Sequence, residues 1–176
     1  MKKLLFATLM GIVMMATTAQ AKTLVAYFSA TGTTAQVAEK LAKVTGADLF
    51  EIKPEQPYTE ADLNWRDDQS RSSVEMNDRS SRPAIANKVE NMAQYDTVFI
   101  GSPIWWGREP SIIDTFVESY DFSGKRIIPF VTSGSSDIGD YGQNLQALAP
   151  NASVDTGKRF PSSVSEETLA AWAKEK

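Results

Sequence analysis

Residues 27–41 read YFSATGTTAQVAEKL, in which an apolar run passes through a short turn into a segment with helical spacing. The turn contains four hydroxyl side chains and one glycine, and no Lys, Arg or His: Ser29, Thr31, Gly32, Thr33 and Thr34. Glycine lets the backbone approach a ligand closely, and the N–H groups at the head of a helix favour an anion. The stretch therefore predicts a strand–turn–helix unit whose turn suits a phosphate ester, neutralised by dipoles rather than by cations.

Two well-known nucleotide motifs are absent from this turn. The Lys of the G-x-x-x-x-G-K-[ST] loop is missing, and so is the G-x-G-x-x-G dinucleotide pattern. A turn rich in Ser and Thr before a helix is also a common helix cap. From these residues alone, phosphate binding and simple capping are both open interpretations.

Strand-like and helical patterns alternate along the chain. Apolar runs predict five strands, at 23–29, 47–52, 95–102, 126–133 and 152–160. Helical spacing follows at 33–45, over about ten residues from Pro110, at 138–149 and at 165–176, where Ser163 and Glu166 have capping-box spacing, and it also occurs at 82–95. This alternation predicts an α/β fold, a five-stranded parallel sheet with helices on both faces.

Residues 53–82 interrupt the alternation with a polar and highly charged stretch. A segment of this length without clear periodicity is either a working lid or a solvated, disordered insertion. Its arginines are candidates for binding an anionic electron donor, or for pairing with acids such as Glu75 and Asp78: Arg66, Arg71, Arg79 and Arg82.

Two further loops follow predicted strands, and in an open parallel sheet ligands bind beyond the carboxyl ends of the strands. The loop GSPIWWGREP at 101–110 places Trp105 and Trp106 side by side, as walls for a flat aromatic ligand. The loop TSGSSDIGDYG at 132–142 is small, polar and rich in glycine, which suits hydrogen bonds to the edge of a ring. Three strand ends thus offer a phosphate cradle, an aromatic wall and a polar rim.

The turn matches the flavodoxin phosphate-loop pattern [ST]-x-T-G-x-T as Ser29-x-Thr31-Gly32-x-Thr34, and over 23–160 the chain resembles the flavodoxin-like family of FMN-binding redox proteins. The resemblance implies strand order 2-1-3-4-5, a three-layer fold and non-covalently bound FMN. It implies that the phosphate is held by Ser29, Thr31, Gly32, Thr33 and Thr34, that the flavin lies against Pro103, Ile104, Trp105, Trp106 and Gly107, and that its polar edge contacts Ser133, Gly134, Ser135 and Gly139. The loop after the fourth strand departs from the family pattern, because it has no clear stacking tyrosine and Tyr141 is only a candidate.

Three functions are consistent with this resemblance. The chain is an electron carrier that docks on partner proteins, an FMN-dependent reductase that takes hydride from NAD(P)H and reduces a quinone or similar acceptor, or a flavin-free binding module on the same fold. In the first two, the chemistry belongs to FMN. A turn without a cation also predicts a low potential for the second electron.

Composition excludes other classes. The absence of Cys and His excludes disulfides, thiolate metal sites and Ser-His-Asp hydrolysis. The chain carries 18 Lys and Arg against 22 Asp and Glu, and removal of Lys2 and Lys3 leaves 16 basic residues and a net charge of −6. We expect no nucleic-acid partner, because the domain has no cationic footprint.

The first 21 residues have the layout of a secretory signal peptide. Lys2 and Lys3 precede an apolar stretch at 4–15, and Ala19-Gln20-Ala21 has the pattern of a cleavage site. The apolar stretch is short for a membrane span, so an uncleaved anchor is the less favoured alternative. We expect residues 22–176 to form one exported domain, periplasmic or secreted, with no stable membrane anchor after cleavage.

Overall fold

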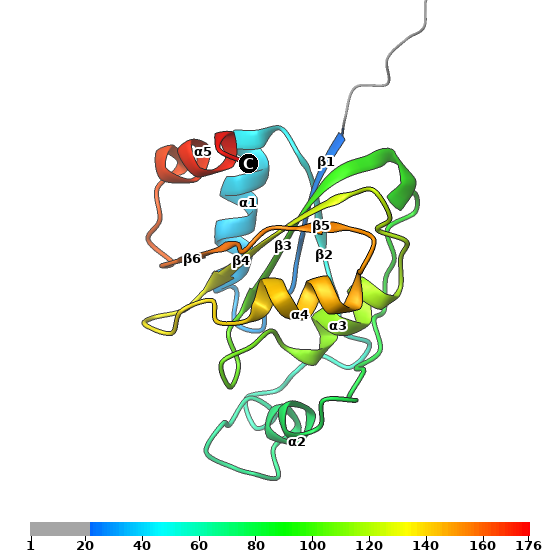
Figure 1. The fold of residues 1–176 in the computed structure, drawn as a ribbon. Helices are drawn as coiled ribbons and strands as arrows, with labels where there is room; N and C mark the ends of the chain where they lie inside the picture. The colour runs from blue at the N-terminus through cyan, green and yellow to red at the C-terminus, as the bar shows by residue number, and fades with distance from the viewer. Residues whose placement is uncertain (1–21) are drawn as a thin grey trace, which may run out of the picture.

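A parallel β-sheet forms the centre of the computed structural model, which describes residues 22–176 (Figure 1). The predicted signal peptide at 1–21 lies outside the described residues. The strands that pair in parallel are β1 (Lys22–Tyr27), β2 (Asp48–Glu51), β3 (Tyr95–Pro103), β4 (Arg126–Thr132) and β5 (Ser153–Val154). Their order in the sheet is β2-β1-β3-β4-β5. The predicted strand order is confirmed.

The last predicted strand, 152–160, is interrupted. The short strand β5 (Ser153–Val154) pairs with the start of β4, and β6 (Lys158–Phe160) pairs with the end of β4. Between them the chain turns at Gly157, which has a φ of 76° and donates its N–H to the Asp155 carboxylate at 2.9 Å. The sheet therefore has six strands where the sequence predicts five, with two of them sharing one edge position.

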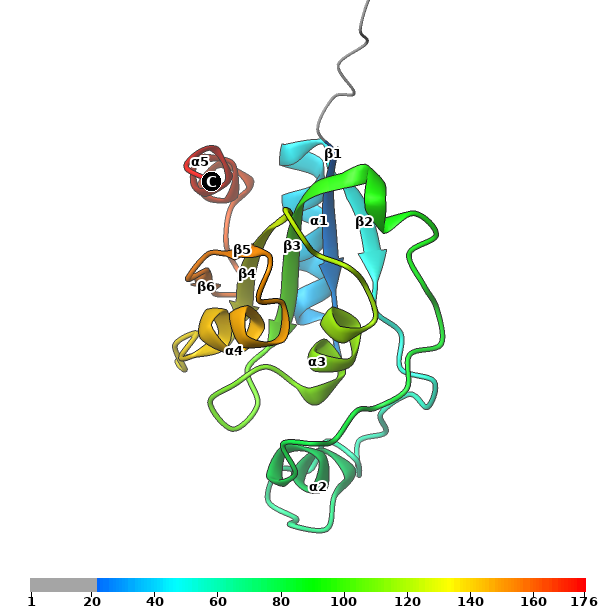
Figure 2. The ribbon, with the colours of Figure 1, turned by 45° about the vertical axis from the view of Figure 1, so that its right-hand side comes forward.

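Helices cover both faces of the sheet. Helices α1 (Thr33–Thr45) and α5 (Glu166–Lys174) lie on one face, and α3 (Ser111–Glu118) and α4 (Tyr141–Leu148) lie on the other (Figure 2). Along β1, Leu24 and Ala26 pack into the α3/α4 core, whereas Val25 and Tyr27 pack into the α1/α5 core. Alternate side chains are buried on opposite faces, which explains the nearly continuous apolar run and confirms the three-layer fold.

The segment between β2 and β3 differs from the prediction. A helix, α2 (Arg71–Asn77), forms inside the stretch expected to lack periodicity. Its N-cap is Ser70, whose Oγ accepts from Ser73 N. The predicted helix over 82–95 is wrong, because only the short η1 (Met92–Gln94) is helical there. Instead this part of the chain pairs laterally with the chain after β2: Ala86 N donates to Lys53 O at 2.8 Å and Glu55 N to Ala84 O at 2.9 Å.

The insertion with α2 lies beyond the carboxyl ends of the strands (Figure 2). At the other end of the chain, the predicted capping box is wrong by two residues, because the N-cap of α5 is Ser165, which accepts from Thr168 N at 3.2 Å. Within residues 22–176 no helix is both long enough and apolar enough to cross a membrane.

Candidate functional site

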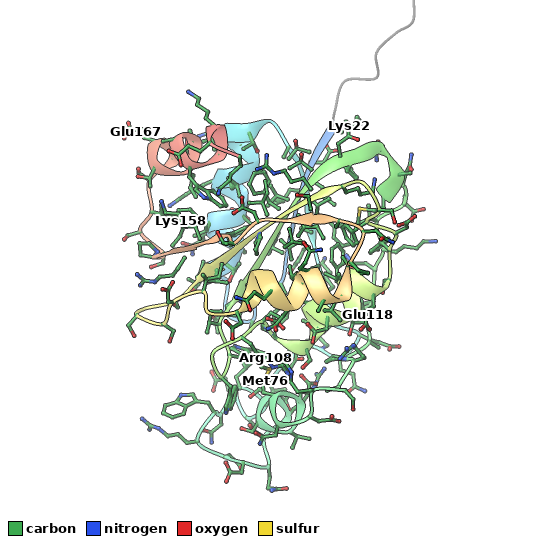
Figure 3. All side chains as sticks on the ribbon, viewed as in Figure 1. Lys22, Met76, Arg108, Glu118, Lys158 and Glu167 are labelled. Atoms are coloured by element: carbon green, nitrogen blue, oxygen red, sulfur yellow. The ribbon has the colours of Figure 1, made fainter. Side chains whose placement is uncertain are left out.

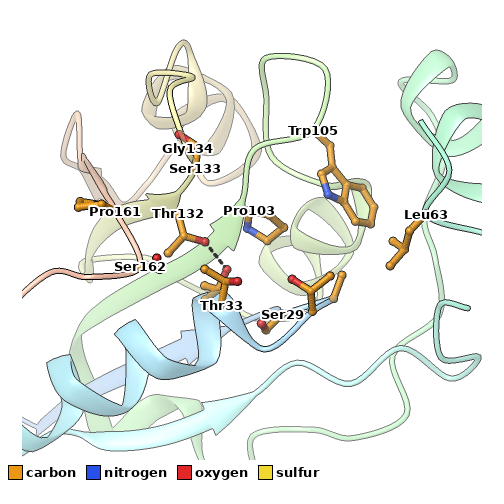
Figure 4. Close-up of a pocket in the computed structure, with 13 residues that line it drawn as sticks. Ser29, Thr33, Leu63, Pro103, Trp105, Thr132, Ser133, Gly134, Pro161 and Ser162 are labelled. Carbon is orange, nitrogen blue, oxygen red and sulfur yellow. Dashed lines mark hydrogen bonds between the residues drawn. The ribbon is translucent and has the colours of Figure 1, made fainter. Parts of the chain in front are cut away.

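The turn between β1 and α1 forms the floor of the candidate site. Gly32 occupies the N-cap position of α1 with a φ of 85° and has no side chain to cap the helix. Thr34, in the first turn, forms a hydrogen bond of 2.7 Å between its Oγ1 and Thr132 Oγ1 at the end of β4 (Figure 4). The hydroxyls therefore do not serve as the helix cap, and the first backbone N–H groups of α1 are left for a ligand.

Ser29 Oγ is buried and has no hydrogen-bond partner in the protein. An unsatisfied buried hydroxyl costs about 1–3 kcal/mol, so its presence at this turn points to a polar ligand group. An ideal Cβ placed on Gly32 meets no heavy atom within 4 Å, so the backbone is open on this side. Hydroxyls, free N–H groups and an open backbone together fit a phosphate ester.

A cavity of about 380 Å³ opens above this turn (Figure 4). Eight of the residues predicted for the site line it: Ser29, Thr31, Thr33, Thr34, Pro103, Trp105, Ser133 and Gly134. Ile104 and Trp106 line a neighbouring cavity, which also includes Trp105. The structure thus brings the three predicted loops together at one edge of the sheet.

The other four predicted residues line neither cavity: Gly32, Gly107, Ser135 and Gly139. Gly32 begins α1, as described above, and Ser135 is exposed on its loop. A Cβ on Gly139 would lie 2.8 Å from the carbonyl oxygen of Gly107, so these two glycines place the loop after β3 against the loop after β4.

Trp105 and Trp106 belong to a tight hairpin. Trp105 N donates to Arg108 O at 2.9 Å and Arg108 N to Trp105 O at 3.1 Å. Trp106 and Gly107 have φ values of 48° and 79°, and positive φ at both central residues is the condition for a type I′ turn. Among the described residues, Trp106 is the one non-glycine residue with positive φ.

Aromatic contacts hold Trp105 in place. Its ring lies 5.7 Å from that of Phe28 and 5.4 Å from that of Tyr58, edge-to-face in both cases. Tyr58 belongs to the insertion, where its hydroxyl donates to Glu75 and the Arg71 guanidinium lies 4.0 Å from its ring centroid. Burial and the Glu75 carboxylate raise the pKa of Tyr58, so it stays neutral. The insertion thereby fixes the orientation of one wall of the cavity.

The loop after β4 is supported from β6. The Arg159 guanidinium donates to Ser133 Oγ at 3.1 Å and to Ser133 O at 2.8 Å, and also reaches Gly134 O. Tyr141, the candidate for stacking on the flavin, is fully buried in the core, and its hydroxyl oxygen accepts from Ser102 Oγ at 3.3 Å. It has no face available for a ligand, so that interpretation is wrong.

Five residues of the first cavity were not predicted as site residues: Ala30, Leu63, Thr132, Pro161 and Ser162. Pro161 and Ser162 follow β6, whose carboxyl end meets the same edge of the sheet as the other parallel strands. That rule could have identified them. No local signal places Leu63 at the site; it comes from the insertion and lines the cavity together with Trp105 (Figure 4).

Arg108 lies where α2 meets the sheet domain (Figure 3) and belongs to a buried charged cluster with Glu109 and Asp114. Arg108 donates to Ser111 Oγ at 3.1 Å and lies 3.5 Å from Asp114, and Ser111 Oγ donates to the Glu75 carbonyl of α2. Glu109 accepts from Asn144 of α4. Burial, with a smaller contribution from Glu109, raises the pKa of Asp114 to about 7. The cluster links the hairpin to α2, α3 and α4.

Comparison with known proteins agrees with this geometry. A family model described as flavodoxin matches residues 22–176. The crystal structure of a candidate flavoprotein from Bacteroides eggerthii DSM 20697 is 50% identical, with a TM-score of 0.83 over 88% of this chain and 97% of that one. One from Bacteroides uniformis ATCC 8492 is 51% identical, with a TM-score of 0.83 over 88% of this chain and 98% of that one.

A more distant flavoprotein from Lactobacillus acidophilus NCFM, crystallised in complex with FMN, has the same fold. It is 24% identical, with a TM-score of 0.64 over 87% of this chain and 99% of that one. No curated protein sequence matches the chain.

Proposed function

Because this chain belongs to the flavodoxin family, we propose that it is a redox protein that transfers electrons through non-covalently bound FMN. The observation that carries this proposal is the unpartnered Ser29 Oγ beside the free N–H groups of α1, in a turn without cations. FMN combines a phosphate ester with a flat ring, and the Lactobacillus acidophilus relative was crystallised with it.

The bound flavin would supply one- or two-electron chemistry, and the protein would supply binding, orientation and electrostatics. In this proposal the turn from Ser29 to Thr34 holds the phosphate. Beneath the phosphate, the Thr34–Thr132 hydrogen bond joins the first turn of α1 to the end of β4. Trp105 forms an apolar wall that Phe28 and Tyr58 hold in position, and the loop from Ser133 provides polar backbone groups on the opposite side.

The test is a fluorescence titration of purified residues 22–176 with FMN and with riboflavin, which lacks the phosphate. We expect FMN to bind at least tenfold more tightly than riboflavin. In Ser29→Ala we expect FMN affinity to fall about tenfold or more, because a hydrogen bond to a charged group contributes about 1.5–3 kcal/mol. The stability of the flavin-free chain should not fall, because the hydroxyl that is removed has no partner.

The control is Ser153→Ala, an exposed serine on β5, which should leave both affinities unchanged. Equal affinity for the two flavins would contradict the phosphate cradle. A chain that binds neither flavin would contradict the proposal and support the flavin-free binding module.

A second candidate function is an FMN-dependent reductase that acts on a small molecule. The position of the insertion favours it, because Leu63 lines the first cavity and Trp65 the neighbouring one. Two of its four arginines are already paired with carboxylates and are less available to an anionic donor: Arg71 pairs with Glu75 at 2.6 Å and Arg82 with Glu118 at 2.7 Å. Anaerobic addition of NADH or NADPH to the FMN-loaded protein separates reductase from carrier, because only a reductase bleaches the flavin at catalytic rates.

We also propose that the protein is exported and works in the periplasm or outside the cell. The support is the signal-like pattern of residues 1–21 in the sequence. A chain exported unfolded has to acquire FMN after export. Cell fractionation with N-terminal sequencing tests this proposal, and a cytoplasmic protein that retains residues 1–21 would contradict it.

A further inference from the structure

The loop after β4 directs two consecutive carbonyl groups toward one guanidinium. Arg159 of β6 donates through Nη2 to Ser133 O at 2.8 Å and to Gly134 O, and through Nε to Ser133 Oγ at 3.1 Å. The C=O and N–H groups of a trans peptide point in opposite directions, and the described residues form no cis peptide bond. The N–H groups of Gly134 and Ser135 therefore both point away from Arg159.

Neither of these two N–H groups donates to a backbone oxygen of the described residues. The Ser133 hydroxyl is engaged within the protein, because it accepts from Arg159 and donates to Ser136 O. Ser133 and Gly134 line the first cavity (Figure 4), whereas Arg159 lines neither cavity. The loop therefore offers a ligand backbone N–H groups rather than the Ser133 hydroxyl, and consecutive N–H groups that point the same way attract an electronegative atom.

The break in the last strand is what places Arg159 beside this loop. Between β5 and β6 the chain contains one residue more than the part of β4 with which it pairs. Val154 packs against the α3/α4 core and Phe160 belongs to the α1/α5 core, although an unbroken strand would place both on one face because they are an even number of residues apart. Arg159 precedes Phe160, so its side chain is turned to the α3/α4 face.

The positive charge of Arg159 is not paired with a carboxylate. Within residues 22–176 no Asp or Glu oxygen lies within 4.0 Å of its guanidinium nitrogens, whereas Arg126, at the other end of β4, pairs with Asp155 at 3.8 Å. A cation that donates to a carbonyl oxygen polarises the peptide group, which makes its N–H a stronger donor. The N–H groups of Gly134 and Ser135 therefore transmit part of this charge to the side away from Arg159.

We propose that Arg159 is a positioning residue of the flavin site, which aims and polarises the N–H groups of Gly134 and Ser135 at the polar edge of the bound ring. This role rests on the proposed function. The reduced ring carries more negative charge at that edge than the oxidised ring does, so polarised donors hold the reduced form more tightly. Arg159 thereby partly offsets the effect of the cation-free phosphate turn on the potential, without contacting the flavin itself.

The experiment measures, without oxygen, the Kd of residues 22–176 for oxidised FMN and for FMN reduced with dithionite. In Arg159→Met, which removes the charge and keeps an unbranched side chain, we expect the Kd for reduced FMN to rise about tenfold more than the Kd for oxidised FMN. This change lowers the two-electron potential of the bound flavin by about 30 mV. Arg159→Lys keeps the charge, so the ratio of its two Kd values should stay within about threefold of the native ratio.

The matched control is Arg126→Met, which removes the same charge at the other end of β4, outside both cavities, and should change the ratio of the two Kd values less than twofold. An equal rise of both Kd values in Arg159→Met would assign Arg159 a structural role only and overturn the proposal. A selective loss that Arg159→Lys does not rescue would also overturn it.

Two further outcomes are distinguishable. If urea unfolding shows that Arg159→Met does not fold, Arg159→Gln, which keeps an amide donor without the charge, makes the same comparison. If the native chain binds neither form of FMN, the proposed function fails and the role of Arg159 fails with it. A native chain that binds both forms, with no selective loss in the Arg159 variants, contradicts the role of Arg159 and leaves the proposed function intact.

Discussion

Two buried side-chain oxygens in the described part of the chain have no hydrogen-bond partner, Ser29 Oγ and Asp114 Oδ1. Ser29 lies in the first cavity, where a ligand can complete its hydrogen bonding. Asp114 lies in neither of the two site cavities, among Arg108, Arg82 and Glu109. Its raised pKa means that the folded protein holds a proton there more tightly than the unfolded chain does. The same kind of defect therefore indicates binding at one residue and proton uptake at the other.

This proton uptake predicts how stability depends on pH. The stabilisation from protonated Asp114 is complete below its ordinary pKa of 3.8 and is lost as pH rises through its folded value of about 7. Asp114→Asn removes this dependence, so the variant should gain stability relative to the native chain between pH 4 and pH 8, by up to about 4 kcal/mol. Urea unfolding across this range measures the difference.

The control for this prediction is Asp121→Asn, because hydrogen bonds from Ser123 lower the pKa of that exposed carboxylate. Its stabilisation is present above the ordinary pKa of the carboxyl and is lost as pH falls through the lowered one, so Asp121→Asn should lose stability at neutral pH. A difference between native and Asp114→Asn proteins that stays constant with pH would contradict the assignment.

At the scale of elements, two loops form the site by contacting each other. The type I′ hairpin at Trp105–Arg108 and the loop after β4 meet where Gly139 faces the Gly107 carbonyl. Both glycines have positive φ, 79° at Gly107 and 58° at Gly139. The hairpin therefore depends on the absence of a side chain in a different loop, about thirty residues away in the sequence.

We predict that Gly139→Ala weakens FMN binding at least fivefold, because its Cβ pushes the Gly107 carbonyl and moves the hairpin that contains Trp105. Gly124→Ala is the matched control: Gly124 has a φ of 72° but no heavy atom near its Cβ position. Both variants should lose about 1 kcal/mol of stability from the strained backbone. Denaturation together with FMN titration checks this, and equal FMN affinity in the two variants would contradict it.

At the scale of the molecule, the charge distribution disfavours added negative charge on a bound flavin. The domain without residues 1–21 has the net charge of −6 derived above, and no ionisable side chain among the described residues lines either cavity. Arg159 lies behind the loop after β4, with its guanidinium donating to backbone oxygens. The phosphate of FMN would therefore be neutralised by dipoles only.

We predict that the second-electron potential of the bound flavin lies below that of free FMN. Two unit charges about 9 Å apart in a medium of effective dielectric about 20 interact by about 1.8 kcal/mol, which is about 80 mV for one electron. Thr31→Lys adds a cation to the turn and should raise this potential, whereas Gln36→Lys makes the same change in net charge on an exposed part of α1 outside the cavity and should raise it less. Spectroelectrochemical titration measures the second-electron potential of the native protein and of both variants. A native potential above that of free FMN would contradict the prediction.

Local patterns were enough to predict the layered fold and the position of the turn between β1 and α1, because alternating burial and turn chemistry are encoded within a few neighbouring residues. The stretch from Tyr27 to Leu41 predicted the helix from Thr33 as the structure has it, and a strand that ends two residues earlier in the structure, at Tyr27. The apolar runs that predicted the strands also placed the three loops that follow them at one edge of the sheet, because the carboxyl ends of parallel strands meet there.

Features that depend on contacts between distant residues became visible in the folded chain alone. Lateral pairing with the chain after β2 replaced the helix predicted at 82–95, and the break at Gly157 divided the last strand. Packing of Tyr58 against Phe28 and Trp105 brought the insertion to the site. These outcomes come from long-range packing and hydrogen bonding, which override local propensity and leave no periodic trace in the sequence.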